Sequence, residues 1–244
     1  MNKNGNNNII ASNSEYRKDD ELLTKAVLDA CTDIQNRYVC KIPDNWTIER
    51  GPANITYKNI VDRGIENGYS REFMEAQYGV NSSIVTDANI IYLVICNGDK
   101  REKKPLFIGE MKKQGTNDKR IAEGKKKQAK GNAAGDRACK NFQIAGDYCF
   151  CCDKEFFPYT IFFHGCDYDK RTIDKTTIGK LKPFFGDFNV LNPYFNKEGI
   201  AFGKRFGGSC FYQKDPYSSD QLYDICYKCC EKGLKHYLKK YNVV

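Results

Sequence analysis

The chain has 244 residues, with 39 lysines and arginines against 31 acidic residues, which gives a formal net charge of +8. This length allows a single domain whose core needs no disulfide or metal, and the basic balance mildly favours a polyanionic partner. No apolar run is as long as a membrane span, and the first residues form no apolar signal segment. We therefore expect a soluble, cytoplasmic protein with no membrane partner.

Helical patterns dominate the first third of the chain. Residues 1–17 are polar and are predicted to form a disordered N-terminal tail. A helix is predicted over residues 19–34, where acidic residues precede apolar residues at helical spacing. Residues 44–51 interrupt that pattern, and a weaker helical pattern covers residues 71–78.

Two apolar runs, at residues 90–96 and 106–109, predict a pair of antiparallel strands. The sequence Asn97–Gly98–Asp99 between them is a strong turn signal. Residues 100–105 are charged and end in proline, so we expect the connection to be longer than a minimal hairpin.

The following part of the chain begins with a lysine-rich stretch. A helix is then expected through residues 133–146, and a buried strand at residues 157–163. Residues 165–215 are rich in aromatic residues, glycine and proline, and are predicted to be irregular.

The chain ends in a helical pattern. Ser218 and Gln221 have the spacing of a capping box, which predicts a C-terminal helix that runs to residue 241. The order of all these elements predicts a single mixed α/β domain over residues 18–244, with an antiparallel pair in its sheet.

Twelve cysteines are spread over the chain, and several stand in apolar positions. In an intracellular protein of this size we expect reduced thiols that pack as small hydrophobic side chains. A structural zinc site is the alternative, because Cys226 and Cys229 have the Cys-x-x-Cys spacing. This pair falls in the predicted C-terminal helix, so reduced thiols are the favoured interpretation.

Charged residues stand next to both apolar strands. Asp87 precedes the first strand and Glu110 ends the second, and the two are equally far from the centre of the turn. They are therefore expected to pair across the hairpin. Side chains alternate along a strand, so Glu110 and Lys112 are predicted to share one face while Met111 points to the other.

Hydrolysis of a phosphodiester bond requires a nucleophilic water and neutralisation of charge at the phosphorus, which bound Mg²⁺ supplies. Asp87 and Glu110 are the predicted metal ligands, together with the backbone carbonyl of Met111. Lys112 is expected to contact the scissile phosphate and to orient the attacking water. The predicted catalytic residues are therefore Asp87, Glu110 and Lys112. The simpler alternative is a solvent-exposed polar strand end, because short charged motifs also occur by chance.

A basic stretch follows this strand directly. Its lysines are expected to contact the phosphate backbone of DNA, which would make binding dependent on salt. A solvated charged surface is an equally good interpretation of the same residues. The expected backbone contacts are Lys113, Lys119, Lys125 and Lys130.

Four segments in the right order carry a family resemblance. They are residues 81–91 around Asp87, residues 110–115 with the Glu-x-Lys motif, residues 131–141 and residues 157–165. These segments resemble the EcoRI-type restriction endonucleases of the PD-(D/E)XK nuclease superfamily, and they outline a catalytic core of about residues 81–165. Thr86 stands where that family usually has a proline.

The resemblance implies a restriction-endonuclease-like fold, in which helices flank a central mixed sheet made of an antiparallel catalytic hairpin plus a parallel strand. It also implies a type II restriction endonuclease, a homodimer that cuts double-stranded DNA at a short palindrome and leaves 5′-phosphates. The implied cofactor is Mg²⁺, for which Mn²⁺ can substitute. The implied partner in the same system is a cognate DNA methyltransferase.

Base recognition is predicted for residues 131–141. Asparagine pairs bidentately with adenine and arginine with guanine in the major groove, which suits Asn132 and Arg137. Ala133 is small enough to approach a thymine methyl group. By resemblance, Asp136 cross-links this segment or accepts a hydrogen bond from a base amine. The alternative is a solvent-exposed helix start, and the segment is one residue longer than the family pattern, which leaves the recognition sequence open.

Two other functions fit the same residues. One is a non-catalytic, cysteine-rich DNA-binding protein, and the other is a PD-(D/E)XK repair nuclease with structural specificity. His164 is also a candidate general base, although its place at the end of an apolar strand favours a structural role.

Overall fold

The computed structural model describes most of the chain outside two long gaps. The described residues are 4–66, 68–77, 83–113, 141, 144–146, 148–149, 152–153, 156–164, 200–202, 208–213 and 215–243. Within helices and strands, the side chains of residues 4–17, 112, 113, 163, 200–202, 208, 210 and 212 are not described.

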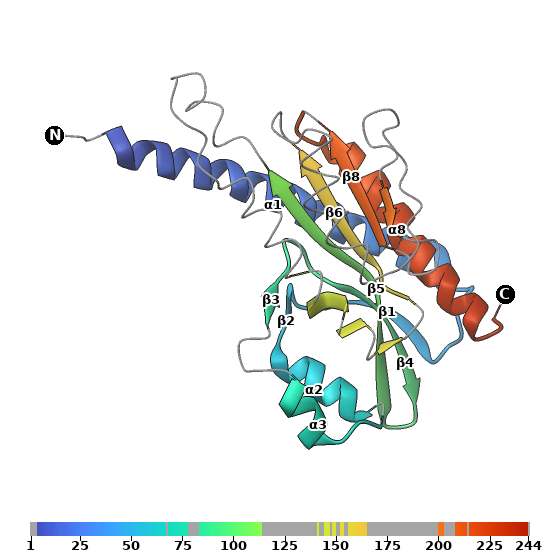
Figure 1. Ribbon diagram of the computed structural model, residues 1–244. Helices are drawn as coiled ribbons and strands as arrows, with labels where there is room; N and C mark the ends of the chain where they lie inside the picture. Colours follow the sequence, from blue (N-terminus) through green and yellow to red (C-terminus); the bar gives the residue numbers. More distant parts are fainter. Residues whose placement is uncertain are drawn as a thin grey trace.

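The centre of the molecule is a six-stranded sheet in the order β1-β4-β5-β6-β8-β7 (Figure 1). Strands β1, β4 and β5 are antiparallel, whereas β5, β6 and β8 are parallel, and β7 closes the sheet with an antiparallel pairing. The predicted mixed sheet is therefore confirmed. The strands are β1 (Trp46–Arg50), β4 (Ile91–Asn97), β5 (Lys100–Lys113), β6 (Tyr159–His164), β7 (Ile200–Phe202) and β8 (Gly208–Gln213).

Helices cover both faces of this sheet (Figure 1). The long helices α1 (Asn4–Tyr38) and α8 (Ser219–Lys240) lie side by side on one face and share a core with it. On the other face lie α2 (Tyr57–Glu66), α3 (Arg71–Gln77) and the two-stranded sheet of β2 (Asn54–Ile55) and β3 (Ile84–Val85). Buried residues between 144 and 152 pack on that second face as well.

Strand β4 explains how one sheet serves two cores. Ile91, Leu93 and Ile95 pack toward α1 and α8, whereas Tyr92 and Val94 pack toward α2 and α3. All five are buried. A strand with both faces covered reads as an unbroken apolar run rather than an alternating one, which is the pattern found at residues 90–96.

The connection between β4 and β5 is shorter than predicted. Asn97 pairs with Lys100, so the turn consists of Gly98 and Asp99 alone, and Gly98 has a φ of 62°. A two-residue hairpin turn requires this left-handed backbone, and glycine adopts it without steric cost. The prediction of a longer loop was wrong because charged residues were taken as a loop, whereas they form the first part of β5 near the exposed turn.

A one-residue bulge interrupts the hairpin farther from the turn. Tyr92 pairs with Pro105, but the next pair is Ile91 with Phe107, so Leu106 is the extra residue. Leu106 and Phe107 are both fully buried on the α1 and α8 side. Proline lacks the N–H that a regular ladder uses, and bulges are among the few strand positions that tolerate it.

Helix α8 lies very close to the backbone of this bulge. A Cβ on Gly233 would stand 2.7 Å from the carbonyl oxygen of Leu106 and 3.1 Å from its Cα. These distances are too short for any side chain, so glycine at this position lets α8 approach β5.

Several elements differ from those predicted. Helix α1 begins at Asn4, well before residue 19, and so includes much of the stretch predicted to be disordered. A helix that is anchored by tertiary packing can extend at little cost, because each further residue adds a hydrogen bond. Strand β1 lies within residues 44–51, which were predicted only to interrupt a helical pattern, and Trp46 and Ile48 alternate there toward the core.

Two further predictions were incomplete. Helix α2 was not predicted, although α3 at residues 71–77 was. Residues 165–215 were predicted to be irregular, but β7 and β8 lie within them. These two strands are short, and β8 is held by pairing with β6, which is far from it in sequence.

The C-terminal helix is confirmed. Gln221 N–H donates to the Ser218 hydroxyl, and the Gln221 side chain accepts from Ser218 N–H, which completes the capping box. None of the eight described cysteines is joined in a disulfide bond. Burial raises the pKa of the Cys226 and Cys230 thiols well above the usual value, as expected for thiols packed in a core.

Candidate active site

Asp87 lies on the short connection from β3 to β4 and reaches β5. Its Oδ2 accepts a hydrogen bond of 2.7 Å from the backbone N–H of Met111. The Thr24 hydroxyl, on α1, donates to the Asp87 carbonyl oxygen at 3.3 Å. Asp87 is thus held from two sides, by a helix of one layer and by a strand of the sheet.

Glu110 is a fully buried carboxylate in the middle of the sheet. It lies on β5, in register with Ile161 of the parallel strand β6, and its side chain has no exposed surface. The amide Nδ2 of Asn141 donates to Glu110 Oε1 at 2.8 Å. A buried carboxylate is costly unless it is hydrogen-bonded, so this amide stabilises Glu110 in its position.

The alternation predicted for this strand is confirmed where side chains are described. Ile108 packs in the α2 and α3 core and Met111 packs in the α1 and α8 core, so Glu110 shares the face of Ile108. Lys112 belongs to β5 by its backbone, which pairs with Phe163. The side chains of Lys112 and Lys113 lie outside the described residues.

The bulge changes the register of the hairpin on the side from which Asp87 approaches β5. In the regular hairpin near the turn, the pairing would place Asp87 opposite Glu110. The extra residue in β5 shifts the register by one position, and the Asp87 side chain accepts a hydrogen bond from the backbone N–H of Met111. Asp87 itself precedes β4, so its pairing with Glu110 stays a prediction, but Asp87 lies next to the residues that were predicted to act with it.

This arrangement offers oxygen atoms of the kind that hard divalent cations prefer. The Asp87 carboxylate is bonded to the same peptide unit that joins Glu110 to Met111, so two carboxylates and the predicted Met111 carbonyl belong to one small region. Mg²⁺ commonly uses one or two carboxylates and keeps several waters, which fits this set. Within the described part of the chain, no cluster of three or more His, Cys, Asp or Glu side chains could hold a metal ion.

Two residues of α1 lie near this region and were not predicted. One is Thr24, which bonds to the backbone of Asp87. The other is Asp19, whose Oδ2 lies 3.2 Å from Nε2 of His164 at the end of β6. His164 is only 2% exposed and also contacts the ring of Tyr217 edge-on. This buried pairing supports the structural interpretation of His164. Asn141 was also missed as a contact of Glu110, although it ends the segment predicted to recognise bases.

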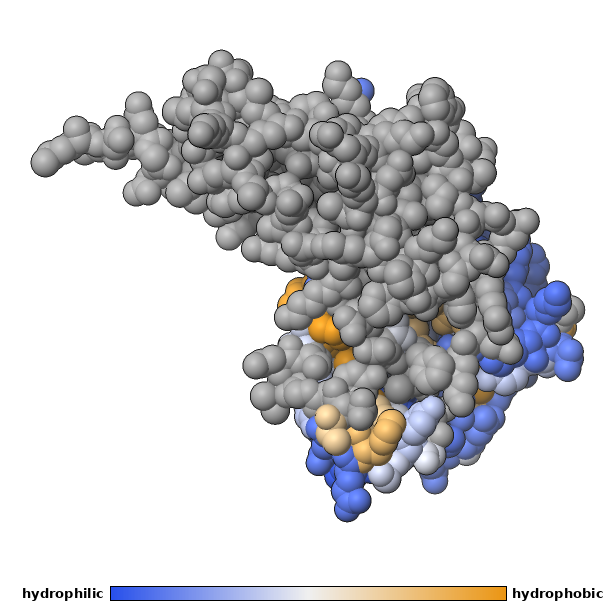
Figure 2. Space-filling model, viewed as in Figure 1, coloured by the Kyte–Doolittle hydropathy of each residue, from blue (hydrophilic) through white to orange (hydrophobic). Residues whose placement is uncertain are grey.

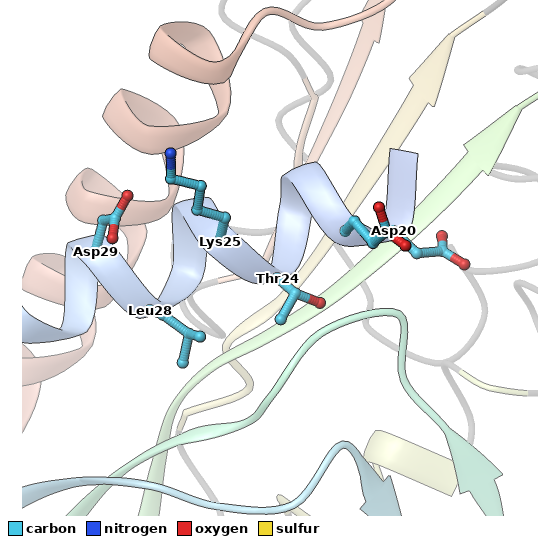
Figure 3. Close-up of a pocket in the computed structure, with 6 residues that line it drawn as sticks. Asp20, Thr24, Lys25, Leu28 and Asp29 are labelled. Atoms are coloured by element: carbon cyan, nitrogen blue, oxygen red, sulfur yellow. The ribbon is translucent and has the colours of Figure 1, made fainter. Parts of the chain in front are cut away.

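A hollow of about 420 Å³ lies along α1 beside Thr24 (Figure 3). Thr24 and Leu28 point to the same side of the helix in this view, and Lys25 and Asp29 point to the other. The lining carries three carboxylates and one ammonium, from Asp20, Glu21, Asp29 and Lys25. Such a lining disfavours a polyanion, so we assign no DNA contact to it.

The predicted recognition residues cannot be compared with the structure. The following predicted DNA contacts lie outside the described residues: Asn132, Ala133, Asp136, Arg137, Lys119, Lys125 and Lys130.

On the face shown in Figure 2, most of the described surface is hydrophilic, with a few smaller apolar areas. None of the helices that the structure describes is long and apolar enough to cross a membrane.

Comparison with known families gives one clear result. The family model described as "Restriction endonuclease EcoRI" matches residues 59–193, which is more than half of the chain. The matched region begins in α2 and contains Asp87, Glu110, Lys112 and residues 131–141. No curated protein matches the chain.

Proposed function

Because the chain belongs to the EcoRI restriction endonuclease family, we propose that it is a type II restriction endonuclease that cuts double-stranded DNA at a short palindrome, requires Mg²⁺ and leaves 5′-phosphates. The observation that carries this proposal is the hydrogen bond from Met111 N–H to the Asp87 carboxylate, directly beside the buried Glu110. It brings the Asp87 carboxylate to the backbone of the Glu-x-Lys motif, whose Glu110 lies 23 residues farther along the sequence.

Asp87, Glu110 and the carbonyl of Met111 are the proposed metal ligands. A divalent ion bound there, Mg²⁺ or Mn²⁺, would neutralise charge at the phosphorus and lower the pKa of a bound water. Asp87 keeps its carboxylate in place through its bond to β5, and Asn141 does the same for Glu110. Lys112 would contact the scissile phosphate and orient the attacking water.

Specificity is proposed to come from residues 131–141, which precede and include Asn141. Asn132 and Arg137 would read adenine and guanine edges, with Ala133 against a methyl group and Asp136 as a cross-link. A palindromic site is best matched by a two-fold symmetric enzyme, so we propose a homodimer. Lys113, Lys119, Lys125 and Lys130 would follow the phosphate backbone, and a cognate methyltransferase would protect the host DNA.

The proposed domain organisation has one functional unit. The region from 18 to 244 would form the endonuclease domain, with its catalytic core at about 81–165. Described elements on both sides of that core, α1 and α8, pack together against the same sheet, which supports a single unit.

The test is cleavage of plasmid and genomic DNA, followed by sequencing of the fragment ends. We expect discrete fragments with Mg²⁺ or Mn²⁺ and none with EDTA, and ends that share one short palindrome with 5′-phosphates. Asp87→Asn and Lys112→Ala should bind DNA but not cut it, whereas Asp99→Asn at the hairpin turn should cut normally.

Other outcomes would identify the alternatives. Tight DNA binding without cleavage in any divalent metal would indicate a non-catalytic DNA-binding protein. Cleavage at branched or damaged DNA with no common sequence would indicate a repair nuclease.

A further inference from the structure

Thr86, the residue before Asp87, is buried and makes two hydrogen bonds. It is only 3% exposed. Its backbone N–H donates to the carbonyl oxygen of Ala53 at 3.0 Å, which continues the pairing of β2 with β3. This bond fixes the chain just before Asp87.

The second bond fixes the chain just after Asp87. The Thr86 hydroxyl donates to the carbonyl oxygen of Ala88 at 2.7 Å, so the side chain spans Asp87 and closes a tight loop around it. Hydrogen bonds of this local type give a turn a defined backbone conformation. The hydrogen bonds of Thr86 therefore fix the backbone on both sides of Asp87.

Two further hydrogen bonds hold the residues that follow Ala88 against Gly51. Asn89 Nδ2 donates to the carbonyl oxygen of Gly51 at 2.8 Å, and Gly51 N–H donates to the carbonyl oxygen of Ile90 at the same distance. Asp87 thus lies between Thr86, which makes two hydrogen bonds, and a firmly held segment at the start of β4.

We propose that Thr86 is the positioning residue of the active site, whose hydroxyl orients the Asp87 carboxylate toward β5. This inference rests on the proposed function only in that Asp87 is a metal ligand there. Proline at this position would restrict φ, but it has no N–H for Ala53 and no hydroxyl for Ala88. In this chain the two hydrogen bonds of Thr86 restrict the turn, whereas a proline would restrict it through its pyrrolidine ring.

Two substitutions of Thr86 distinguish the effect of its hydroxyl from the effect of its side-chain shape. Thr86→Val keeps the branched shape and the backbone N–H but removes the hydroxyl, which leaves the buried carbonyl of Ala88 without this donor. Thr86→Ser keeps the hydroxyl and removes a methyl group. If the hydroxyl positions Asp87, valine should impair the site and serine should preserve it.

The first readout does not depend on cleavage. Amide hydrogen exchange at Met111 reports the bond to Asp87, and exchange at Leu93, in the middle of the β1–β4 pairing, reports general stability. In Thr86→Val we expect exchange at Met111 to be about ten-fold faster and exchange at Leu93 to be unchanged. Thr86→Ser should resemble the wild type at both positions.

The second readout is the Mg²⁺ dependence of single-turnover cleavage. Thr86→Val should raise the half-saturating Mg²⁺ concentration about ten-fold, while metal-free DNA binding stays unchanged, and Thr86→Ser should restore the wild-type value. Equal exchange at Met111 in Thr86→Val and wild type would overturn the inference. A wild-type protein that cuts no DNA would refute the proposed function instead, and the exchange measurement would still decide the role of Thr86.

Discussion

Residues 100–105 and residues 106–111 belong to the same strand, β5, but they meet the rest of the molecule in different ways. The first part, the turn half, carries charged side chains that pair with one another, as Glu102 does with Lys100 at 3.0 Å and Lys104 at 3.4 Å. The second part, the core half, is buried between two layers of helices and contains Glu110. The bulge at Leu106 separates them.

The difference shows that one strand can contain both a segment that tolerates substitution and a segment that holds an active-site carboxylate in a defined position. In the turn half, partly exposed charges are screened by water, and single ion pairs contribute little to stability. The hydrogen bond from Lys100 lowers the pKa of Glu102, but this side chain remains about a quarter exposed. In the core half, a carboxylate is held away from water by packing and by Asn141. Substitutions should therefore have very different effects on the two halves.

The largest expected effect compares the two glutamates. Glu110→Gln removes the charge but keeps the shape and an oxygen that can accept from Asn141. We expect the single-turnover cleavage rate with Mg²⁺ to fall by roughly a thousand-fold, with little loss of DNA binding. Glu102→Gln should cut at the wild-type rate. Equal losses in both variants would mean that the halves do not differ in function.

The next effect concerns stability at the bulge. Gly233→Ala would place a Cβ against the backbone of Leu106, so the protein must shift α8 or β5. We expect the free energy of unfolding to fall by about 1–3 kcal/mol, measured by urea denaturation. Gly68→Ala is the control for a glycine with open space around it, although its φ of 93° adds some strain. The bulge would be less tightly packed than described if Gly233→Ala were the more stable of the two.

A smaller effect is expected at Asn141. Asn141→Ala removes the donor to Glu110, so the carboxylate should become less ordered and single-turnover cleavage should slow by about ten-fold. The matched control is Asn45→Ala, which removes an amide donor to the carbonyl of Cys96 near the turn. That variant should cleave normally, and a similar slowing in it would argue against a specific role for Asn141.

The smallest effect concerns the rates at which different cysteine thiols react, and it involves no change in cleavage activity. Cys96 lies near the turn and is partly exposed, whereas Cys226 and Cys230 lie in the core that packs against the core half of β5. Burial raises the pKa of these two thiols, so they hold less thiolate at neutral pH. A maleimide should modify Cys96 before either of them, as followed by mass spectrometry. Early labelling of Cys230 would indicate that this core opens readily.

The sequence predicted those features that depend on local order. The apolar run at residues 90–96 predicted a buried strand because both of its faces are covered. The spacing of Ser218 and Gln221 predicted the start of α8, because a capping box involves only four successive positions. The alternation around Glu110 followed from the period of a strand, and Asp87, Glu110 and Lys112 were identified as a motif in the same way.

The sequence was less informative where structure depends on distant partners. Strands β1 and β8 were missed because each is short and gains its stability from a neighbour far along the chain, β4 or β6. The bulge was not predicted, since an extra residue is accommodated by the packing of Leu106 and Phe107 under α1 and α8. The hydrogen bond from Met111 N–H to the Asp87 side chain was likewise not predicted, because it joins two segments that only the fold brings together.

The sequence by itself thus determined the chemistry of the candidate site, namely two carboxylates and an Asp…Glu-x-Lys order on a hairpin. Only the tertiary structure decided how they are held: Asp87 by Met111 and Thr86, Glu110 by Asn141, and His164 by Asp19. The physical reason is that residue type and local spacing fix which groups are available, whereas their positions depend on hydrogen bonds and packing between segments that are distant in the chain.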